Sequence, residues 1–436
     1  MKILQINSVC GVGSTGRIAV DIAKTAQEQG NDALIAYGRS YKETPGIKAI
    51  RIGSDYEVYL HGLYTRLTDK TGFASTMATV KFIEEVRRYK PDIIHLHNIH
   101  GYYVNIELLF NFLRKANIPV VWTLHDCWAF TGHCTHFDYV GCNQWKTGCN
   151  NNCPQKQSYP ASLFLSNAAS NYRKKRDLFT SVNNMTIVTP SQWLAGLVKE
   201  SFLQKYPVKV IHNGIDTEIF KPTPSDFRQK YGLEDKFIVL GVANVWDKRK
   251  GLEDFIKLSD MLDDSYRIVL VGLSEKQIKN LPDKKIIGIT RTSNATELAG
   301  IYSTADIFVN ASVEETFGLT NVEALACRTP VIAYDCGPTN EIVDGDCSKL
   351  VPNGDVYALK TDVGKTLQKD DVHHARNVEY TKKFDKREKF IEYVRLYSKI
   401  LIIILVLLYN NCNLFDNIKG FAFLFKEYVC LKVRPL

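Results

Sequence analysis

The stretch NASVEETFGLTNVEALACRTPVIA, residues 310–333, combines the end of a β-rich run, a loop, a helical run and a second β-rich run. A strand, a helix and a second strand in this order predict two parallel strands joined by a helix that covers the sheet. The chain repeats this alternation along most of its length. The sequence therefore predicts an α/β fold built on parallel sheets.

Two glutamates flank the predicted start of the helix, Glu315 in the loop and Glu323 about one turn inside. Backbone N–H groups at a helix start are unpaired and, with the helix dipole, can hold a diphosphate; here they belong to Gly318, Leu319 and Thr320. Glu323 can accept hydrogen bonds from ribose hydroxyls, and Glu315 can contact a sugar. Thr320 and Glu323 also fit a capping box, which needs no ligand, so both interpretations stay open.

The alternation of β-rich and helical runs divides the chain into two sheets in tandem, as a length of 436 residues suggests. A turn signal at Asn213-Gly214 and two prolines shortly after it mark the join. We expect two Rossmann-like βαβ domains, facing a central cleft in which a ligand binds. The predicted boundaries are 1–212 for the N-terminal domain, 213–397 for the C-terminal domain and 398–436 for an apolar tail.

A glycine-rich loop, VCGVGSTGR at residues 9–17, follows the first predicted strand and has the spacing G-x-G-x-x-G. A dinucleotide site would also need an acidic residue at the end of the second strand, and the sequence has none there. Arg39 lies at that end and fits the 2′-phosphate of NADP, which keeps an NADP-dependent oxidoreductase as an alternative. The same glycines let backbone N–H groups approach another phosphate or a sugar.

Cations and histidines follow other strands at the same carboxyl edge of the predicted sheets. Lys248, Arg249 and Lys250 follow the first strand of the second domain, where they can neutralise a diphosphate or form an ordinary solvated loop. His125 and Asp126 end a strand of the first domain. The preceding strand ends with three histidines that either shape an acceptor site or satisfy loop hydrogen bonds: His95, His97 and His100.

Five cysteines crowd into one insert of the first domain: Cys127, Cys134, Cys142, Cys149 and Cys153. Their intervals differ from the paired spacing of a zinc ribbon, so we expect packing residues, with a structural metal or a disulfide as alternatives. The run Asp344-Gly345-Asp346 predicts a turn between a helix and a strand more simply than it predicts a metal site.

The net charge of +8 is modest for this length and gives no indication of a nucleic-acid partner. One dense basic run predicts either a solvated helix face or a contact with an anionic membrane: Arg173, Lys174, Lys175 and Arg176. The N-terminus lacks a secretory signal, so we expect a cytoplasmic protein, peripheral at the inner face of the membrane. The tail run ILIIILVLLY, residues 400–409, predicts a buried helix, an interfacial anchor or a partner contact.

Together these motifs resemble the family 4 retaining glycosyltransferases of the GT-B fold. The resemblance rests on the two glutamates, the Lys250-Gly251 loop, the glycine loop and two further runs, IHNGIDTEIF at 211–220 and TLHD at 123–126. It covers residues 1–397, and the cysteine-rich insert resembles that of bacterial transferases that build exopolysaccharide, capsule or colanic-acid-type glycans.

The resemblance implies a role for each matching position. Lys250 and Arg249 would bind the donor diphosphate, although the family usually has an arginine five positions before the lysine. Glu323 would bind the ribose, while Glu315 and the amides of 318–320 would bind the transferred sugar. His125 would contact that sugar from the other domain. Two further groups would complete the site: Gly13 and Ser14 at the reaction centre, and Ile289 and Thr290 beside the base.

The resemblance also implies the reaction. The donor would be a UDP- or GDP-sugar, and the acceptor a growing, lipid-linked glycan or glycolipid of a surface polysaccharide. Transfer with retention would pass through a short-lived ion pair in which the leaving phosphate takes the acceptor's proton, so no cofactor and no catalytic metal are expected. His97, His100 and Asp126 would line the acceptor side. A non-catalytic protein that binds sugar nucleotides is a further alternative.

Overall fold

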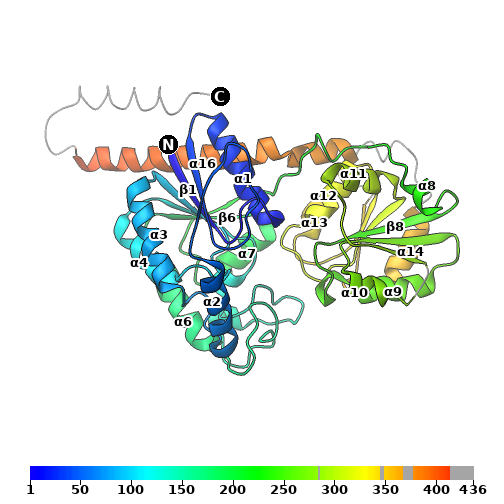
Figure 1. Cartoon of the computed structure of the whole chain (residues 1–436), viewed down its shortest axis with the longest axis horizontal. Helices are drawn as coiled ribbons and strands as arrows, with labels where there is room; N and C mark the ends of the chain where they lie inside the picture. The colour runs from blue at the N-terminus through cyan, green and yellow to red at the C-terminus, as the bar shows by residue number, and fades with distance from the viewer. Residues whose placement is uncertain (283–284, 344–347, 367–376, 413–436) are drawn as a thin grey trace. The chain divides into compact units, whose positions relative to one another are not determined.

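Seven parallel strands form the first sheet of this computed structural model, which describes residues 1–282, 285–343, 348–366 and 377–412 (Figure 1). The strand order is β3-β2-β1-β4-β5-β6-β7. Their bounds are β1 Lys2–Asn7, β2 Asp32–Tyr37, β3 Lys48–Arg51, β4 Ile93–Leu96, β5 Val120–Thr123, β6 Met185–Thr189 and β7 Val208–Val210. The edge strand β3 is short and only half-buried.

The helices of this part connect the strands: α1 Gly13–Glu28, α2 Asp55–Thr68, α3 Thr76–Tyr89, α4 Ile106–Ala116, α5 Gln144–Thr147, α6 Ala168–Phe179 and α7 Gln192–Glu200. One face of α1 is buried through Ile18, Ala19 and Ile22, whose spacing matches one side of a helix. These residues pack in one cluster with residues of β1, β2, β4 and β5. This packing fixes the strands, and with them the loops that follow their carboxyl ends.

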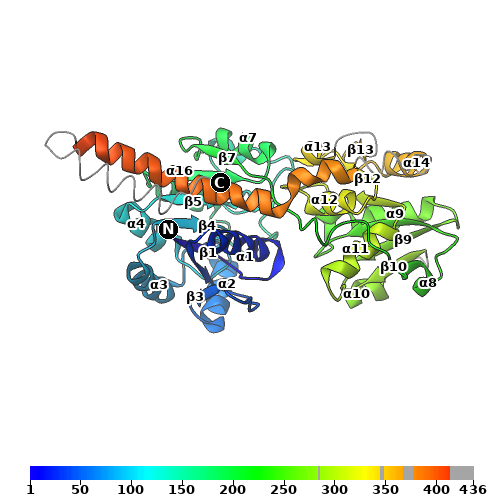
Figure 2. The ribbon, with the colours of Figure 1, turned by 90° about the horizontal axis from the view of Figure 1, so that it is seen from above.

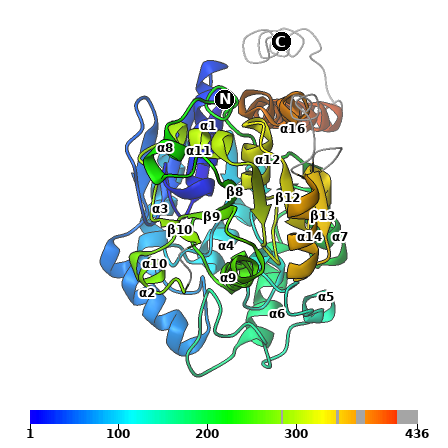
Figure 3. The same cartoon turned by 90° about the vertical axis from the view of Figure 1, so that its right-hand side faces the viewer.

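Six parallel strands form the second sheet in the order β10-β9-β8-β11-β12-β13. Their bounds are β8 Phe237–Val242, β9 Tyr266–Val271, β10 Ile286–Ile289, β11 Ile307–Asn310, β12 Val331–Tyr334 and β13 Ser348–Val351. The helices are α8 Phe227–Tyr231, α9 Leu252–Met261, α10 Glu275–Lys279, α11 Ala295–Thr304, α12 Leu319–Ala326, α13 Thr339–Ile342 and α14 Val356–Thr366. Figure 3 shows α11 and α12 on one side of this sheet and α9 on the other.

Both faces of the second sheet are buried, as parallel sheets require. Along β8, Ile238 and Leu240 belong to one apolar cluster, whereas Val239 belongs to the cluster on the opposite face. This alternation follows from the two-residue period of a strand. The predicted pair of Rossmann-like βαβ domains in an α/β fold is confirmed.

The chain divides into two compact units. The first comprises Met1–Thr189, Ala195–Ile211 and the described part from Phe390 on, and the second comprises Pro190–Leu194 and His212–Lys389. The join after Ile211 lies beside the predicted boundary at 212. Residues 390–397, which were expected in the second domain, pack with the first.

The helix α16, Lys386–Cys412, is the reason for that difference. Phe390, Tyr393 and Tyr397 are buried in the apolar cluster that also contains α1. Figure 2 shows α16 beside α1 in the first unit. The predicted tail 398–436 is therefore, as far as 412, the continuation of a helix that starts well before it. Residues 413–436 and the run 344–346 lie outside the described residues.

Candidate functional site

Two loops meet at the carboxyl edge of β8 and β11 in the second unit. The short helix η2, Lys248–Lys250, follows β8, and the backbone N–H of Val313 donates to the carbonyl of Arg249 at 2.9 Å. Gly251 has a φ of +75°, and a Cβ there would lie 2.2 Å from the carbonyl oxygen of Ala311. Only glycine permits this approach, which fixes the basic loop against the loop that contains Glu315.

Lys250 and Glu315 form an ion pair at this place. Both side chains are largely buried, at 23% and 13% exposed. Burial by itself would raise the pKa of Glu315, but Lys250, together with Ser312 and Arg249, holds that pKa below its usual value. Glu315 is therefore ionised at neutral pH, and Lys250 supplies a fixed cation next to the start of α12.

The helix α12 starts at Leu319, directly after Gly318, whose φ is +84°. No side chain caps this start, and Thr320 is already inside the helix, so the capping box that the sequence allowed is not formed. Instead, the Glu323 carboxylate accepts a hydrogen bond of 3.1 Å from the hydroxyl of Tyr302, a buried residue of α11. Glu323 is thus held by a partner that the local spacing could not indicate.

Ile289 is the last residue of the edge strand β10 in the same unit, and Thr290 follows it. The carbonyl of Ile289 already accepts hydrogen bonds from the N–H groups of Gly272 and Leu273, at 2.8 and 3.2 Å. A carbonyl oxygen has two lone pairs, so Ile289 has no further acceptor for a base. Thr290 is exposed and can still offer its backbone groups to the base.

A chain of hydrogen bonds in the first unit orients His125. Gln5 donates its amide N–H to the carbonyl of Ala19 at 2.8 Å, so its oxygen faces Nε2 of His97 at 2.9 Å. Burial lowers the pKa of His97 well below its usual value, and the neutral ring must donate from Nε2. Nδ1 of His97 then accepts from Nε2–H of His125 at 3.0 Å, which fixes the tautomer of His125.

A small pocket surrounds His125 at the carboxyl edge of β4 and β5. His97, Asn98, Ile99, His100, Trp122, Thr123, Leu124, His125, Asp126, Trp128 and Ala129 line it. His100 Nε2 lies 2.9 Å from the carboxylate of Asp126, and its Nδ1 lies 3.3 Å from the hydroxyl of Tyr159. Burial would raise the pKa of Asp126, yet His100 and other polar neighbours lower it to about 2.

Comparison with known proteins gives two family matches that together span most of the chain. Residues 15–219 match the family described as Glycosyltransferase Family 4, and residues 225–395 match Glycosyl transferases group 1. The chain is a family 4 glycosyltransferase of the GT-B type. It is accordingly an enzyme of the hexosyltransferase kind, and this removes the oxidoreductase and the non-catalytic binding protein as alternatives.

One sequence relative and several solved structures match most of this glycosyltransferase. A protein of Escherichia coli K12 described as a colanic acid biosynthesis glycosyl transferase, WcaC, is 24% identical over 389 residues, which is 82% of this chain and 89% of WcaC. Sucrose-phosphate synthase of Thermosynechococcus elongatus superposes with a TM-score of 0.69 at 17% identity, over 92% of this chain and 99% of that one. HepE of Anabaena, in complex with UDP and glucose, superposes with a TM-score of 0.65 at 18% identity, over 92% and 100%.

The glycine loop of the glycosyltransferase builds the start of α1. Gly11 has a φ of +70°, and a Cβ there would lie 2.6 Å from the carbonyl oxygen of Lys42. Gly13 and Ser14 are exposed in the first turn of α1, where backbone N–H groups have no partner within the helix. Arg39 is exposed at the neighbouring strand end. The pocket around His125 does not include Gly13 or Ser14.

The basic run 173–176 is only partly the surface that the sequence indicated. Arg173, Lys174 and Arg176 are exposed on α6, but Lys175 is buried and was wrongly included. Its ammonium donates to the carbonyls of Trp128 and Thr131 and lies 3.6 Å from the centre of the Trp128 ring. Burial lowers the pKa of Lys175 to about 7. The helical period turns this one lysine inward, away from its three neighbours.

All five cysteines of the insert are unbridged, and two of them, Cys127 and Cys134, are buried. Within the described residues, no three histidine, cysteine, aspartate or glutamate side chains come together as ligands of a metal ion. Cys142, Cys149 and Cys153 are only partly buried, so the packing interpretation applies to Cys127 and Cys134. Within the same part of the chain, no helix is both long and apolar enough to cross a membrane.

The neutral histidines of the first unit predict a pH dependence of stability. Burial lowers the pKa of His61 and of His125 to about 4, and places His95 and His97 well below their usual value. The unfolded chain binds more protons between about pH 6.5 and 4, so stability falls as the pH falls through this range. We expect a loss of about 1 to 2 kcal/mol per histidine by pH 5, measured by urea unfolding at pH 7 and pH 5.

His61 provides the control because it lies outside the pocket around His125. The variant His61→Gln should lose less stability between pH 7 and pH 5 than the wild-type chain, by about one such increment. Equal stability of the wild-type chain at the two pH values would contradict the neutral state of these histidines.

Proposed function

We propose that this enzyme transfers a hexose from a UDP- or GDP-sugar, with retention of configuration, to a growing lipid-linked glycan of a surface polysaccharide. The description of the related WcaC as a colanic acid transferase supports the polysaccharide acceptor. The Anabaena neighbour, which holds UDP and glucose, supports the nucleotide-sugar donor. Work at the cytoplasmic face of a membrane is part of the proposal.

The observation that supports the donor site most strongly is the Lys250–Glu315 pair next to the start of α12. A leaving nucleoside diphosphate develops negative charge, which Lys250, Arg249 and the amides of 318–320 can stabilise. Glu315 holds the lysine in place and offers its carboxylate to the sugar hydroxyls. Glu323, one turn further on, faces the ribose in this assignment.

The pocket of the first unit supplies the other groups. His125 has its Nε2 proton engaged with His97 and is neutral, so it serves as a hydrogen-bonding group for the sugar and not as a cation. His97, at 1% exposed, acts through His125 and positions it. Asp126 and His100 are left to receive the acceptor. The leaving phosphate takes the acceptor's proton, and no metal is required.

Thermal unfolding with UDP, GDP and NADP in turn, without added metal, tests the donor site. A ligand at a hundred times its dissociation constant stabilises by about 2.7 kcal/mol, enough for a shift of several degrees. We expect a shift with UDP or GDP and none with NADP. A shift with NADP alone would contradict the proposal.

Replacement of Glu323 by alanine should weaken nucleotide binding by about ten- to a hundredfold, because the ribose loses a charge-assisted hydrogen bond. The unfolding temperature without ligand should change little, since Glu323 caps no helix. Calorimetric titration with UDP measures the first effect. Glu253→Ala, which removes an exposed acid from α9, is the matched control and should bind UDP like the wild-type chain.

Glu323→Ala variants have two outcomes that decide the role of this residue. Weaker UDP binding at an unchanged unfolding temperature supports the ribose contact. A variant that unfolds more easily but still binds UDP normally would show that Glu323 has only a structural role, through its contact with Tyr302.

A further inference from the structure

The helix α2 has its apolar and polar sides reversed. Its apolar residues recur with helical spacing on the solvent side, and the two most exposed are Tyr56 at 69% and Tyr59 at 68%. The full stripe comprises Tyr56, Tyr59, Leu60, Leu63, Tyr64 and Leu67. The inward side buries only His61 and Thr65. A surface helix of a globular protein normally buries its apolar side and exposes its polar side.

Polar contacts hold α2 in this orientation. His61 Nδ1 lies 2.8 Å from the hydroxyl of Ser75, and Nε2 of the same ring accepts from the N–H of Gly72 at 3.2 Å. The capping box of Ser54 and Glu57 fixes the start of the helix. Rotation of α2 to bury its apolar stripe would break the His61 contacts, so the stripe is a stable feature of the surface.

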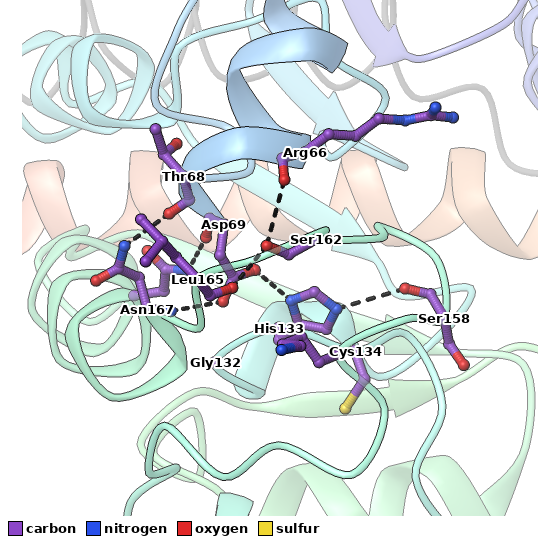
Figure 4. Close-up of polar contacts among 12 residues, drawn as sticks. Arg66, Thr68, Asp69, Gly132, His133, Cys134, Ser158, Ser162, Leu165 and Asn167 are labelled. Atoms are coloured by element: carbon purple, nitrogen blue, oxygen red, sulfur yellow. Dashed lines mark hydrogen bonds and ion pairs between the residues drawn. The ribbon is translucent and has the colours of Figure 1, made fainter.

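A loop beside the end of α2 adds three consecutive exposed apolar residues. Leu163, Phe164 and Leu165 are 55%, 73% and 54% exposed. The N–H of Leu163 donates to the carbonyl of Arg66 at 2.8 Å. Figure 4 shows Ser162 and Leu165, where the buried hydroxyl of Ser162 donates to the carbonyl of Leu165 at 2.6 Å. The loop is thus fixed with its apolar side chains outward, next to the last turn of α2.

Cations border this apolar surface. Arg66 is exposed on α2 itself, and Lys174 of α6 lies 5.3 Å from the ring of Phe73, just beyond the end of α2. Arg173 and Arg176 are exposed on the same helix α6 as Lys174. The acids nearby are paired: Asp55 with Arg51, Glu57 within its capping box, and Asp177 with Arg176. Because Asp177 neutralises Arg176, the unbalanced positive charge in the described contacts is that of Arg66, Arg173 and Lys174, at the end of the stripe that adjoins the loop.

We infer that the outer stripe of α2 and the loop Leu163–Leu165 insert into the headgroup region of a bilayer that contains anionic lipids. Tyrosine and leucine on a solvent-facing helix, with arginine and lysine at its border, are the composition of an interfacial helix. Anionic headgroups complement the cations, and the bilayer covers apolar surface that the described chain leaves open. This surface adds apolar residues to the predicted basic contact, from which only the buried Lys175 is removed.

The surface is connected to the pocket around His125. Tyr159, a few residues before the apolar loop, lies 3.3 Å from His100 through its hydroxyl and packs against Tyr102, which in turn packs against His61 of α2. A lipid-linked acceptor held in the bilayer would thus lie a few side chains from the pocket. This last step rests on the proposed function, whereas the membrane contact itself depends only on exposure and charge.

Vesicle flotation of the full-length protein tests the inference. The probes are vesicles of phosphatidylethanolamine with phosphatidylglycerol, and vesicles of phosphatidylcholine alone. The wild-type chain should float with the first and much less with the second, and added salt should reduce binding. The combined variant Leu163→Ser, Phe164→Ser, Leu165→Ser should bind at least about tenfold more weakly. A second variant, Tyr56→Ser with Tyr59→Ser, should weaken binding independently.

Tyr357→Ser is the matched control, because Tyr357 is 77% exposed on α14 of the second unit. It should float like the wild-type chain. Unchanged flotation of both the loop variant and the Tyr56/Tyr59 variant would overturn the inference. It would also be overturned if the wild-type chain were a dimer, and the loop variant were monomeric but floated like the wild type. Release of UDP from UDP-glucose in the absence of vesicles should be kept by the patch variants. If the wild-type chain released no UDP from UDP-glucose, this result would count against the proposed function and not against the membrane contact.

Discussion

Replacement of Lys250 by alanine should lower the rate of UDP release from UDP-glucose by about a hundred- to a thousandfold, as loss of one preorganised charge-stabilising group commonly does. The variant removes the only cation paired with Glu315 in the described contacts and leaves that buried carboxylate without it. The pKa of Glu315 then rises, because burial is no longer opposed by the lysine. The lost charge and the altered carboxylate both act where the leaving diphosphate develops its negative charge. The value of kcat should therefore fall more than the affinity for UDP.

Lys248→Ala is the control for this prediction. Lys248 belongs to the same short helix as Lys250 but is exposed, and it should tolerate the change with less than a few-fold loss. Lys250→Arg should be faster than Lys250→Ala but slower than the wild-type chain, because arginine keeps the positive charge but differs from lysine in the length and shape of its side chain. If Lys250→Ala retains wild-type turnover while Arg249→Ala does not, the assignment of the diphosphate to Lys250 is wrong.

The second-unit site follows from short-range signals that a sequence contains. The stretch 310–333 indicated a strand, a loop with Glu315 and a helix that starts after Gly318, and the structure has β11 and α12 in these places. The basic loop after β8 reaches the same edge because carboxyl ends of parallel strands share one side of a sheet. Topology alone therefore placed Lys250 near Glu315.

Partners that are far apart in the sequence were not predictable in this way. Tyr302 reaches Glu323 from a different helix, and Gln5 reaches His97 across 92 positions. Such pairs depend on side-chain packing between elements, for which a single sequence has no local signal. The inward direction of Lys175 was missed for a related reason, because a helical run of four basic residues hides which of them faces the core.

The apolar stripe of α2 shows what helical periodicity leaves undecided. Residues at helical spacing normally indicate the buried side of a helix, yet here the buried side is formed by His61 and Thr65. The period predicts that a helix forms and which residues share a face. It does not predict whether protein or another phase covers that face.

Aspartate 69 should be the most sensitive position for the stability of the first unit. It is fully buried at the end of α2, and its carboxylate pairs with His133 and accepts the N–H of Asn167 at 2.7 Å (Figure 4). Asp69→Ala leaves the buried His133 and the half-buried N–H of Asn167 without their acceptor and should lower the free energy of unfolding by about 3 to 5 kcal/mol. Urea unfolding measures this loss, and proteolysis between residues 130 and 170 should become faster.

Asp69→Asn removes the charge but keeps the size and shape of the side chain, so it separates the two contributions to stability. Asp69 has a φ of 56°, which asparagine tolerates and alanine does not, and the amide oxygen still accepts one hydrogen bond, so we expect a loss of about 1 to 2 kcal/mol. Burial opposes the charged form of His133, but Asp69 raises its pKa above the ordinary value. The stabilisation by the pair is therefore complete below about pH 6.5 and is lost as the pH rises through the folded pKa. The difference between wild type and Asp69→Ala should accordingly be larger at pH 6 than at pH 9, and an equal difference at both would show that the pair is not ionic.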